Sequence, residues 1–454
     1  MITSLRIRNF KCLADTGRLS IKPLTFLVGP NSSGKTSIIQ SLLLLRQTVE
    51  SRDLKNPLSI NGQYVQLGSY PDLLFMHGYK ARLQLELEFR PRFRNYLPPM
   101  LREATHYGPE DSYDRINFQV EFGYNKKVMQ IFLHGCQFRV FPASYQFEIL
   151  RTPGGKYQVR YGKGDEPDTN WRALGVPGVE KFYTARSFGL MQNIPTSVMR
   201  FRRALSLLAN QLAREIENLF AGVFYIGPLR EWPKRIYIAT GEAPQDVGLK
   251  GELSVDVLWV QARRKATREK LLGKVNHWMH EFGLALKVEL KRIGGNNYSV
   301  IFQDPHSGLN VNLADVGFGA SQIFPIVVEG FYARDRAMLL VEQPEIHLHP
   351  KAQACLGDLL IDIATSGAGK TLLIETHSEH VLSRIRRRVA EKKLPKDQVA
   401  IYYCEPGAKG TDVREIRIND IGQYEGEGIP PGFFEESYEE SVEHFKALTP
   451  QTSS

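Results

Sequence analysis

One short segment near the N-terminus constrains the fold more than any other part of the sequence. Residues 29–36, GPNSSGKT, fit the pattern G-x-x-x-x-G-K-[ST] of a phosphate-binding loop. An apolar stretch, PLTFLV, precedes the loop, and a helical pattern, KTSIIQSLLLLRQTVES, follows it. A strand, this loop and a helix in that order are typical of α/β proteins with a parallel sheet. A Gly/Ser turn that happens to precede Lys-Thr is the alternative, and the correct flanks on both sides disfavour it.

The residue types of this loop suit a phosphate group. Gly29 and Gly34 let the backbone fold round the phosphate with its N–H groups pointing inward. The start of the following helix adds partial positive charge. Lys35 is expected to reach the β- and γ-phosphates, and Thr36 to bind Mg²⁺. The other candidates for nucleotide contacts in the loop are Asn31, Ser32, Ser33 and Ser37.

A second constraint lies in residues 337–350, AMLLVEQPEIHLHP, where a buried strand runs into acidic residues. Glu342 ends the strand, where an acid that holds Mg²⁺ belongs. Open α/β sheets bind ligands beyond the carboxyl ends of their strands, so this acid and the phosphate loop are expected to face one crevice. The next position, which in ATP-hydrolysing enzymes is often a second acid that activates water, is Gln343. Glu345 is the next acid along the chain.

Three interpretations of this acid pair stay open. Gln343 could orient the attacking water without deprotonating it, as a Gln does in small GTPases. Glu345 could act as the base instead. The site could also hydrolyse ATP slowly, so that bound ATP acts mainly as an assembly signal. Loss of a general base typically costs a factor of ~10²–10⁴ in rate, so slow hydrolysis is not inactivity.

Two further segments are candidates for the site. TLLIETHSEH, residues 371–380, places His377 just past a strand end, from where it could hydrogen-bond a γ-phosphate; a purely structural His is the alternative. NLADVGFGASQIFPIVV, residues 312–328, has Gly319 and then Ser321 and Gln322 near the start of an apolar helix, where hydroxyl and N–H groups can grip an anion. Taken alone, the second segment is better explained as an ordinary N-cap and turn.

The order of patterns along the chain suggests how it is organised. From residue 337 strands alternate with helices, as in a parallel sheet with crossover helices. Between this part and the phosphate loop, ARLQLELEF and INFQVEF alternate apolar and polar residues, as antiparallel strands do. The sequence predicts a first α/β part over 1–80, an inserted antiparallel and helical lobe over 81–222, a second α/β part over 223–410 and an acidic C-terminal cap or tail over 411–454.

Composition limits the function classes. The chain of 454 residues has a net charge of +9, and residues 419–443 hold eight acids without a Lys or Arg, so the rest carries +17. Such a body makes DNA a candidate partner, although a solvated basic surface explains the charge equally well. The four cysteines lie far apart, and we find no signal-peptide pattern and no apolar run long enough to span a bilayer. We expect a cytoplasmic protein without a membrane partner.

Together the motifs resemble the ABC-type ATPase heads of the SMC, RecF and OLD group. GPNSSGKT resembles the Walker A loop, LLVEQPE the Walker B strand, HLHP the D-loop, ETHSEH the switch histidine and DVGFGASQ the signature region, although it departs from the usual LSGGQ. EQPEIHLHP, DVGFGASQ, ETHSEH and a late PPGFF further resemble a predicted-ATPase subfamily with Gln after the first acid. The resemblance covers about residues 1–80 and 220–440.

The resemblance implies a fold and a set of partners. The fold is an α/β, ABC-type P-loop ATPase head with a mixed or parallel core sheet, helices on both faces and an inserted antiparallel and helical lobe. Two heads would dimerise head to tail, with ATP and Mg²⁺ between Lys35, Thr36, Glu342 and His377 of one copy and residues 317–322 of the other. Antiphage systems such as Septu and PARIS resemble this arrangement, a compact ABC-type ATPase with a separate nuclease effector.

Two biological functions follow as hypotheses. The first is an ATP-gated sensor that holds or releases such an effector. The second is a RecF-like DNA-binding ATPase in repair or recombination, for which SRIRRRVAEKK, residues 383–393, supplies six basic residues. In the segment FYIGPLREWPKR, Arg230 or Arg235 could touch a phosphate or DNA, but an Arg on a loop is the simpler interpretation of each. A transport head is a third and weaker alternative.

Overall fold

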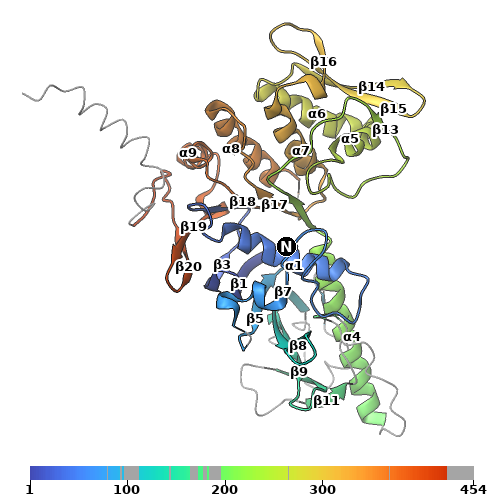
Figure 1. Ribbon diagram of the computed structural model, residues 1–454, viewed down its shortest axis with the longest axis vertical. Coiled ribbons are helices and arrows are strands. Elements are labelled where there is room, and N and C mark those ends of the chain that lie inside the picture. Colours follow the sequence, from blue (N-terminus) through green and yellow to red (C-terminus); the bar gives the residue numbers. More distant parts are fainter. Residues whose placement is uncertain are drawn as a thin grey trace, which may run out of the picture.

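The computed structural model contains a mixed central sheet with further layers on both of its faces (Figure 1). It describes residues 1–78, 80–92, 95–96, 112–142, 145–163, 172–176, 181–183, 196–263, 265–367 and 369–426. The predicted C-terminal cap or tail is described as far as residue 426, and its remainder, including PPGFF, lies outside the described residues.

The central sheet joins the two α/β parts of the chain. Its order is β12 (Val223–Ile226), β17 (Met338–Glu342), β18 (Thr371–Glu375), β4 (Leu24–Val28), β19 (Val399–Gly407) and β20 (Gly410–Ile416). The first five strands are parallel, and β20 is antiparallel to β19. The strand that precedes the phosphate loop therefore lies two places from the acid strand, with β18 between them. The predicted α/β class with a mixed core sheet is confirmed.

Both faces of this sheet are buried, which explains why its strands are continuous apolar runs rather than alternating ones. All five residues of β17 and all five of β18 are buried. In β17 the side chains of Met338 and Leu340 join one hydrophobic core, and those of Leu339 and Val341 join the other. Alternate residues of one strand thus hold the layers on opposite faces together.

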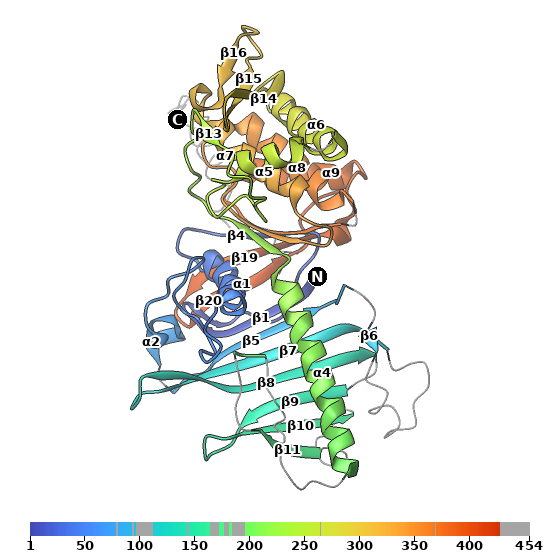
Figure 2. The ribbon, with the colours of Figure 1, turned by 90° about the vertical axis from the view of Figure 1, so that its right-hand side faces the viewer.

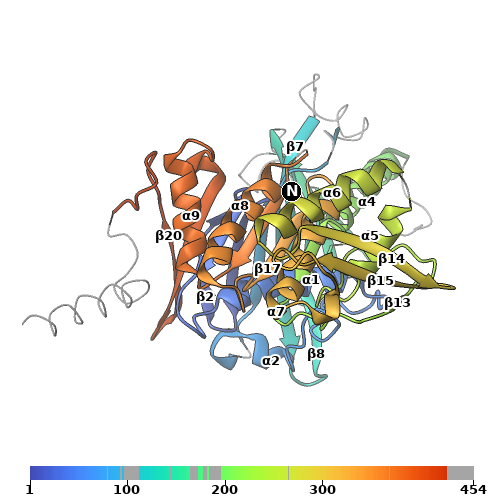
Figure 3. The same ribbon diagram turned by 90° about the horizontal axis from the view of Figure 1, so that it is seen from above.

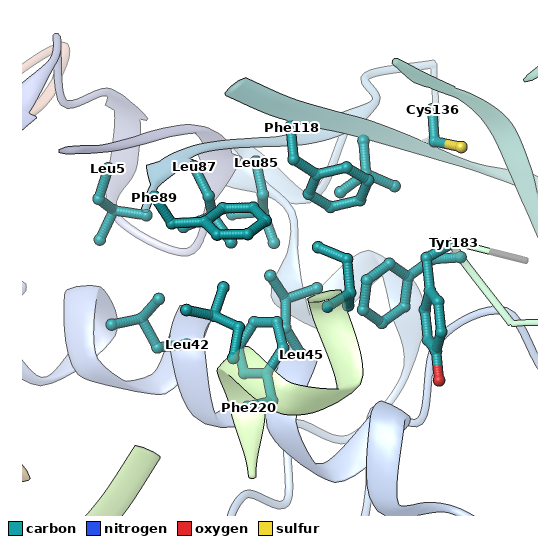
Figure 4. Packing of buried hydrophobic residues seen from close by; sticks show 14 of the residues in the cluster. Leu5, Leu42, Leu45, Leu85, Leu87, Phe89, Phe118, Cys136, Tyr183 and Phe220 are labelled. Carbon is teal, nitrogen blue, oxygen red and sulfur yellow. The ribbon is translucent and has the colours of Figure 1, made fainter. Parts of the chain in front are cut away.

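One face is covered by helix α1 (Lys35–Glu50), which lies between the central sheet and a second, antiparallel sheet (Figure 2). Figure 4 shows Leu42 and Leu45 of α1 facing Leu87 and Phe89 of that sheet. The long helix α4 (Thr196–Phe220) runs across the same sheet and contributes Phe220 to this core. The main strand order of the antiparallel sheet is β11 (Arg172–Val176), β10 (Tyr157–Lys163), β9 (Tyr145–Arg151), β8 (Gln130–Pro142), β7 (Ser112–Asn125), β5 (Leu83–Phe89), β1 (Ile2–Phe10) and β2 (Leu13–Asp15), with β3 (Leu19–Ser20) on β1 and β6 (Asn95–Tyr96) on β7.

The other face is covered by helices from the C-terminal half (Figure 3). These are α5 (Ser254–Ala262), α6 (Lys265–Glu281), α7 (Phe318–Tyr332), α8 (Pro350–Thr365) and α9 (Glu379–Ala390). A small sheet of β13 (Tyr237–Ile238), β14 (Lys287–Gly294), β15 (Asn297–Gln303) and β16 (Asn310–Asn312) packs beside them. The short helices are α2 (Tyr70–Leu73), η1 (Phe75–His77), η2 (Leu313–Asp315) and η3 (Lys396–Gln398). Helices therefore lie on both faces, as predicted.

The N-terminal strand connects the predicted first part with the predicted lobe. β1 pairs along most of its length with β5, and β5 pairs on its other side with β7, which leads to the rest of the antiparallel sheet. The predicted boundary at residues 80 and 81 thus falls just before a strand of a sheet that also contains residues from the first part. The four predicted domain ranges stay a prediction. In the described part of the chain, no helix is long and apolar enough to cross a membrane.

Glu329 is a buried acid in the middle of α7. Its Oε2 accepts a hydrogen bond from the backbone N–H of Val247 at 2.8 Å, while its Oε1 has no hydrogen-bond partner among the described residues. Burial raises the pKa of this carboxyl to about 8. A carboxylate in such a position destabilises the fold whenever it is ionised.

We predict that Glu329→Gln makes the protein more stable in alkaline solution. The carboxyl ionises near pH 4.5 when exposed and near pH 8 when folded, so the folded state binds more protons between these values. Stability of the natural chain therefore falls as the pH rises through this window, and the neutral Gln removes that fall. Urea unfolding at pH 6 and pH 9 measures it, with the exposed Glu242→Gln as control. Equal pH dependence in Glu329→Gln and the natural protein would contradict the prediction.

Candidate nucleotide site

The phosphate loop has the backbone conformation that its glycines predict. Gly29 has φ 138° and Gly34 has φ 93°, both in the region that favours glycine, and Ser32 has φ 61°. A Cβ on Gly29 would lie 2.2 Å from the carbonyl oxygen of Cys404, and one on Gly34 would lie 2.6 Å from Sγ of Cys12. The loop is therefore held closely between β19 and the turn before β2. No side chain caps α1 at Gly34, and the positive end of the helix lies at the end of the loop.

Lys35 lies over this loop. Its Nζ donates hydrogen bonds to the carbonyl oxygens of Gly29 at 3.0 Å and Pro30 at 2.7 Å, and Oγ of Ser33 is 3.4 Å away. Burial lowers the pKa of the Lys35 ammonium. A buried ammonium held only by neutral oxygens is a good partner for the anionic oxygens of a phosphate. Of the other predicted loop residues, Asn31 and Ser32 are exposed, and Ser37 is buried with its Oγ 3.7 Å from Sγ of Cys12.

The carboxyl ends of β17 and β18 place two acids beside the loop. Glu342 and Glu375 are paired residues in the parallel register of these strands. The hydroxyl of Thr36 donates a hydrogen bond to Oε2 of Glu375 at 2.8 Å, while Oε1 of Glu342 accepts one from the Tyr225 hydroxyl at 3.0 Å. The sequence predicted Thr36 and Glu342 at this edge. It did not predict Glu375, although this residue directly precedes the Thr-His of the switch segment.

Burial and mutual repulsion act on both acids. Burial, followed by the charge of Glu375, raises the pKa of Glu342 to about 7. Burial raises the pKa of Glu375 too, opposed by the Thr36 hydrogen bond and the Lys35 charge. Two carboxylates in one buried site are costly unless a cation compensates them.

Arg230 holds the backbone of the acid strand. Its guanidinium donates to the carbonyl oxygens of Glu342 at 3.0 Å, Gln343 at 3.3 Å and Pro228 at 2.9 Å. It is buried, and burial lowers its pKa to about 10. Arg235, in contrast, is exposed and pairs with Asp315 at 2.6 Å. Arg230 and Tyr225 are site residues that sequence reasoning did not assign, because their partners lie far away along the chain.

Gln343 and Glu345 occupy different places in the turn after β17. Gln343 has φ 44°, and its N–H donates to the carbonyl oxygen of Glu375 at 2.8 Å. Oε1 of Glu345 accepts the backbone N–H of His377 at 2.7 Å, and its Oε2 has no hydrogen-bond partner among the described residues. Burial raises the pKa of Glu345. This carboxylate therefore ties the acid turn to the switch segment.

His377 directly follows the Glu375–Thr376 end of the switch strand. Burial, together with the charge of Lys35, lowers the pKa of its imidazole, so the ring is neutral at pH 7. The next residue, Ser378, caps α9 by accepting the N–H of Val381 at 3.1 Å. The structure thus brings the predicted His377 to the same edge as Lys35, Glu342 and Gln343.

The signature-like segment starts α7. The Phe318 ring lies 4.5 Å from the His347 ring and 4.5 Å from the Trp232 ring, between centroids. A Cβ on Gly319 would meet the carbonyl oxygen of His347 at 3.6 Å. The hydroxyl of Ser321 donates a hydrogen bond to the carbonyl oxygen of Phe318 at 2.6 Å, and the next residue, Gln322, is buried. In the described part of the chain this segment contacts the D-loop-like HLHP and is not hydrogen-bonded to the phosphate loop.

The residues present fit a nucleotide with Mg²⁺. Hard oxygen donors, the hydroxyl of Thr36 and the carboxylates of Glu342 and Glu375, gather beside a loop whose N–H groups suit phosphate oxygens. Mg²⁺ prefers such donors and usually shares them with the phosphates of the substrate. The bound cation would offset negative charge on the phosphates during their transfer.

Comparisons with known proteins agree with the phosphate loop and its neighbours. A family model described as an AAA ATPase domain matches residues 1–90 and 260–382. No curated protein matches the chain. Solved structures similar to the chain include SMC heads: one bound to the C-winged helix domain of ScpA is 10% identical, covers 92% of this chain and 98% of its own, with a TM-score of 0.46. One from Thermotoga maritima is 9% identical with coverages of 92% and 99% and a TM-score of 0.41. One from Pyrococcus furiosus, bound to the C-terminal domain of ScpA, is 10% identical with coverages of 98% and 99% and a TM-score of 0.44.

The family match and the loop geometry agree on the class, a P-loop ATPase, for the part of the chain that carries the phosphate loop. Residues 1–90 and 260–382, which are similar to an AAA ATPase domain, contain the phosphate loop, the acid strand and His377, and a domain of this kind binds a nucleotide. The predicted class is confirmed. The predicted subfamily with Gln after the first acid stays a prediction, as do the individual roles of the site residues.

We predict that Gly29→Ala weakens nucleotide binding. The new Cβ meets the Cys404 carbonyl oxygen at 2.2 Å, and φ 138° is strained for alanine, so the loop must move. Strain of this size costs about 1–3 kcal/mol, which corresponds to a loss of about 5- to 150-fold in affinity. Titration with a fluorescent ATP analogue measures the change. The matched control is Gly273→Ala in α6, where a Cβ meets nothing within 4 Å, and its affinity should equal that of the natural protein.

Proposed function

We propose that this chain is a slow ATPase whose ATP-bound state serves as a scaffold for a partner protein. The observation that carries the proposal is the arrangement after β17. The position for a water-activating acid is taken by Gln343, and the nearest other candidate, Glu345, is hydrogen-bonded to the backbone of His377. A Gln amide cannot accept a proton from water at neutral pH, but it can orient one.

The contacts of Glu345 favour a structural over a proton-accepting role. One of its oxygens is occupied by the His377 N–H at 2.7 Å, and the side chain is buried below the acid turn. Its raised pKa would make it basic enough to take a proton, yet a base must also reach the attacking water. Of the three interpretations, the two that do not need Glu345 as a base agree best with these contacts. We combine them: Gln343 orients the water, and hydrolysis is slow.

The scaffold is proposed to be a head-to-tail dimer with ATP between its copies. Two facts support it. The signature-like start of α7 has its contacts with Trp232 and His347 rather than with its own phosphate loop. Trp232 lies beside it, three residues after Leu229, and these two large apolar residues are 70% and 75% exposed. Exposed apolar groups next to a nucleotide site are typical of a surface that a partner covers.

For the partner we propose a separate nuclease effector of an antiphage system, with the ATPase as its ATP-gated sensor. The support is the resemblance of EQPEIHLHP, DVGFGASQ and ETHSEH to ATPases of that kind. A RecF-like DNA-binding function is the alternative.

The basic run in α9 gives little support to the DNA alternative. Asp358 forms ion pairs with Arg384 and Arg388, and Glu391 forms them with Arg387, Arg388 and Lys393. Arg386 lies 3.9 Å from the Tyr424 ring centroid and donates to the carbonyl oxygen of Gly422. Most of the basic groups that suggested DNA binding are therefore used within the fold.

We predict slow ATP turnover that becomes faster in Gln343→Glu. A carboxylate at this position supplies the missing base, and general bases typically contribute ~10²–10⁴ in rate, so an increase of about tenfold or more is expected. Steady-state phosphate release with Mg²⁺ measures it, with Lys35→Ala as the inactive control. Glu345→Gln should keep measurable turnover. Abolished turnover in Glu345→Gln with intact ATP binding would instead make Glu345 the base.

We also predict that Mg-ATP converts the protein from monomer to dimer. Light scattering after size-exclusion chromatography should show the dimer with Mg-ATP and not without nucleotide. Trp232→Ala, which removes exposed apolar surface, should weaken the dimer while each copy still binds ATP. The matched control is Leu207→Ala, which removes an exposed apolar side chain on α4, away from Trp232 in the sequence.

The partner is tested separately. Co-purification with the product of a neighbouring gene supports the effector, whereas ATP-dependent DNA binding with a steep salt dependence supports the alternative.

A further inference from the structure

The hydroxyl of Thr36 is bonded to a carboxylate that the sequence did not single out. In the predicted site the acid of β17, Glu342, is the residue that acts with Thr36 on the cation. In the structure Thr36 donates its hydrogen bond to Glu375 at 2.8 Å, and Glu342 is bonded to Tyr225 at 3.0 Å. The hydrogen bond of Thr36 is thus made to the acid that ends β18 and not to the acid that ends β17.

Strand order explains this exchange. β18 lies between β4 and β17, so the carboxyl end of β18 is nearer to the strand before the phosphate loop than that of β17. Neighbouring strands lie about 4.8 Å apart, which places Glu342 one strand spacing farther from the phosphate-loop strand than Glu375. The two acids are paired residues in the register, so their side chains leave the sheet on the same side.

We propose that the cation site of this ATPase has two carboxylates, with Glu375 as the acid that orients Thr36 and carries Mg²⁺ together with Glu342. The inference rests on the proposed nucleotide function only in requiring that ATP and a divalent cation bind. The role of Glu375 as a cation residue follows from neither the family match nor its position at a strand end alone.

The chemistry of the hydroxyl supports this role. A threonine hydroxyl has one hydrogen and two lone pairs. When the hydrogen is donated to Glu375, the lone pairs are directed away from that carboxylate and are available to a cation. The hydrogen bond therefore fixes Thr36 in the orientation that a metal ligand needs, before any cation arrives.

Charge supports it as well. Glu375 and Glu342 are both buried, and the nearest formal positive charge acting on Glu375 is that of Lys35. The charge of Arg230 acts on Glu342, but its guanidinium is bonded to backbone carbonyls, so neither carboxylate has an ion-pair partner among the described residues. A divalent cation between them restores the balance, and Mg²⁺ is commonly held by one or two carboxylates together with phosphates.

The other contacts of Glu375 give it a fixed position. Its backbone carbonyl accepts the N–H of Gln343 at 2.8 Å, and the Gln343 side chain bonds to its carboxylate. The side chain is thus held between the acid turn and the phosphate loop, so it is placed for a ligand rather than free to swing toward a water molecule.

The experiment uses Mn²⁺ as the probe, because its electron paramagnetic resonance reports binding without turnover. Titrations of Mn²⁺ with ATP and the full chain compare the natural protein with Glu375→Gln, Glu342→Gln and the exposed control Glu242→Gln. We expect the Mn²⁺ midpoint to rise about tenfold or more in Glu375→Gln and in Glu342→Gln. Metal-free binding of a fluorescent ATP analogue should be unchanged or tighter, since a negative charge near the phosphates is removed.

A double-mutant cycle isolates the contact with Thr36. In a Thr36→Val background the further effect of Glu375→Gln on the Mn²⁺ midpoint should be much smaller than in the natural protein. Glu375→Asp, which keeps the charge, should recover part of the Mn²⁺ affinity. Its folding, together with that of Glu375→Gln, is checked by circular dichroism.

Three results overturn the inference. An unchanged Mn²⁺ midpoint with lost hydrolysis in Glu375→Gln would make Glu375 a base rather than a cation residue. Loss of metal-free nucleotide binding would make its role structural. Independent effects of Thr36→Val and Glu375→Gln would remove the proposed coupling. The proposed slow ATPase fails separately, through fast turnover in the natural protein, which would leave a shifted Mn²⁺ midpoint in Glu375→Gln intact.

Discussion

The parallel pairing of β4, β18 and β17 is the constraint on which the rest of the structure depends. It joins residues from opposite ends of the chain, and it does so in one register: Leu27 lies beside Glu375, and Glu375 beside Glu342. A shift of one residue in either pairing would turn one acid away from the phosphate loop. The chemistry of the edge therefore depends on apolar residues in the middle of the strands, which fix this register through packing on both faces.

Burial of both faces also sets the electrostatics of the site. Helix α1 and the antiparallel sheet cover one face, and α7, α8 and α9 cover the other, so the strand ends lie in a region with little water. There the ionised forms of Glu342 and Glu345 are disfavoured, and their pKa values rise. The same layers that hold the register thus also make uncompensated carboxylates at these strand ends unfavourable.

Much of this arrangement could be predicted from the sequence, because its signals are local. The phosphate loop, the acid at the end of β17 and His377 after β18 each follow a short apolar strand. Glu375 could not be assigned in this way, since its importance comes from the position of β18 between β4 and β17. Arg230 was considered only as a possible phosphate or DNA contact, because the backbone carbonyls that it binds carry no sequence signal. The pairing of β1 with β5 likewise depends on contacts between distant residues.

The two unusual residues of the site, Gln343 and Glu375, complement each other. The Gln343 side chain donates a hydrogen bond to the Glu375 carboxylate, a contact that lowers the pKa of Glu375. An acid at position 343 could not donate this bond when ionised, and it would add a third negative charge next to Glu342 and Glu375. A neutral amide at this position avoids that added charge, but it also lacks the base that a Glu would supply. On this argument the lack of a second acid after β17 is linked to the two adjacent carboxylates, and the proposed slow hydrolysis would follow from it.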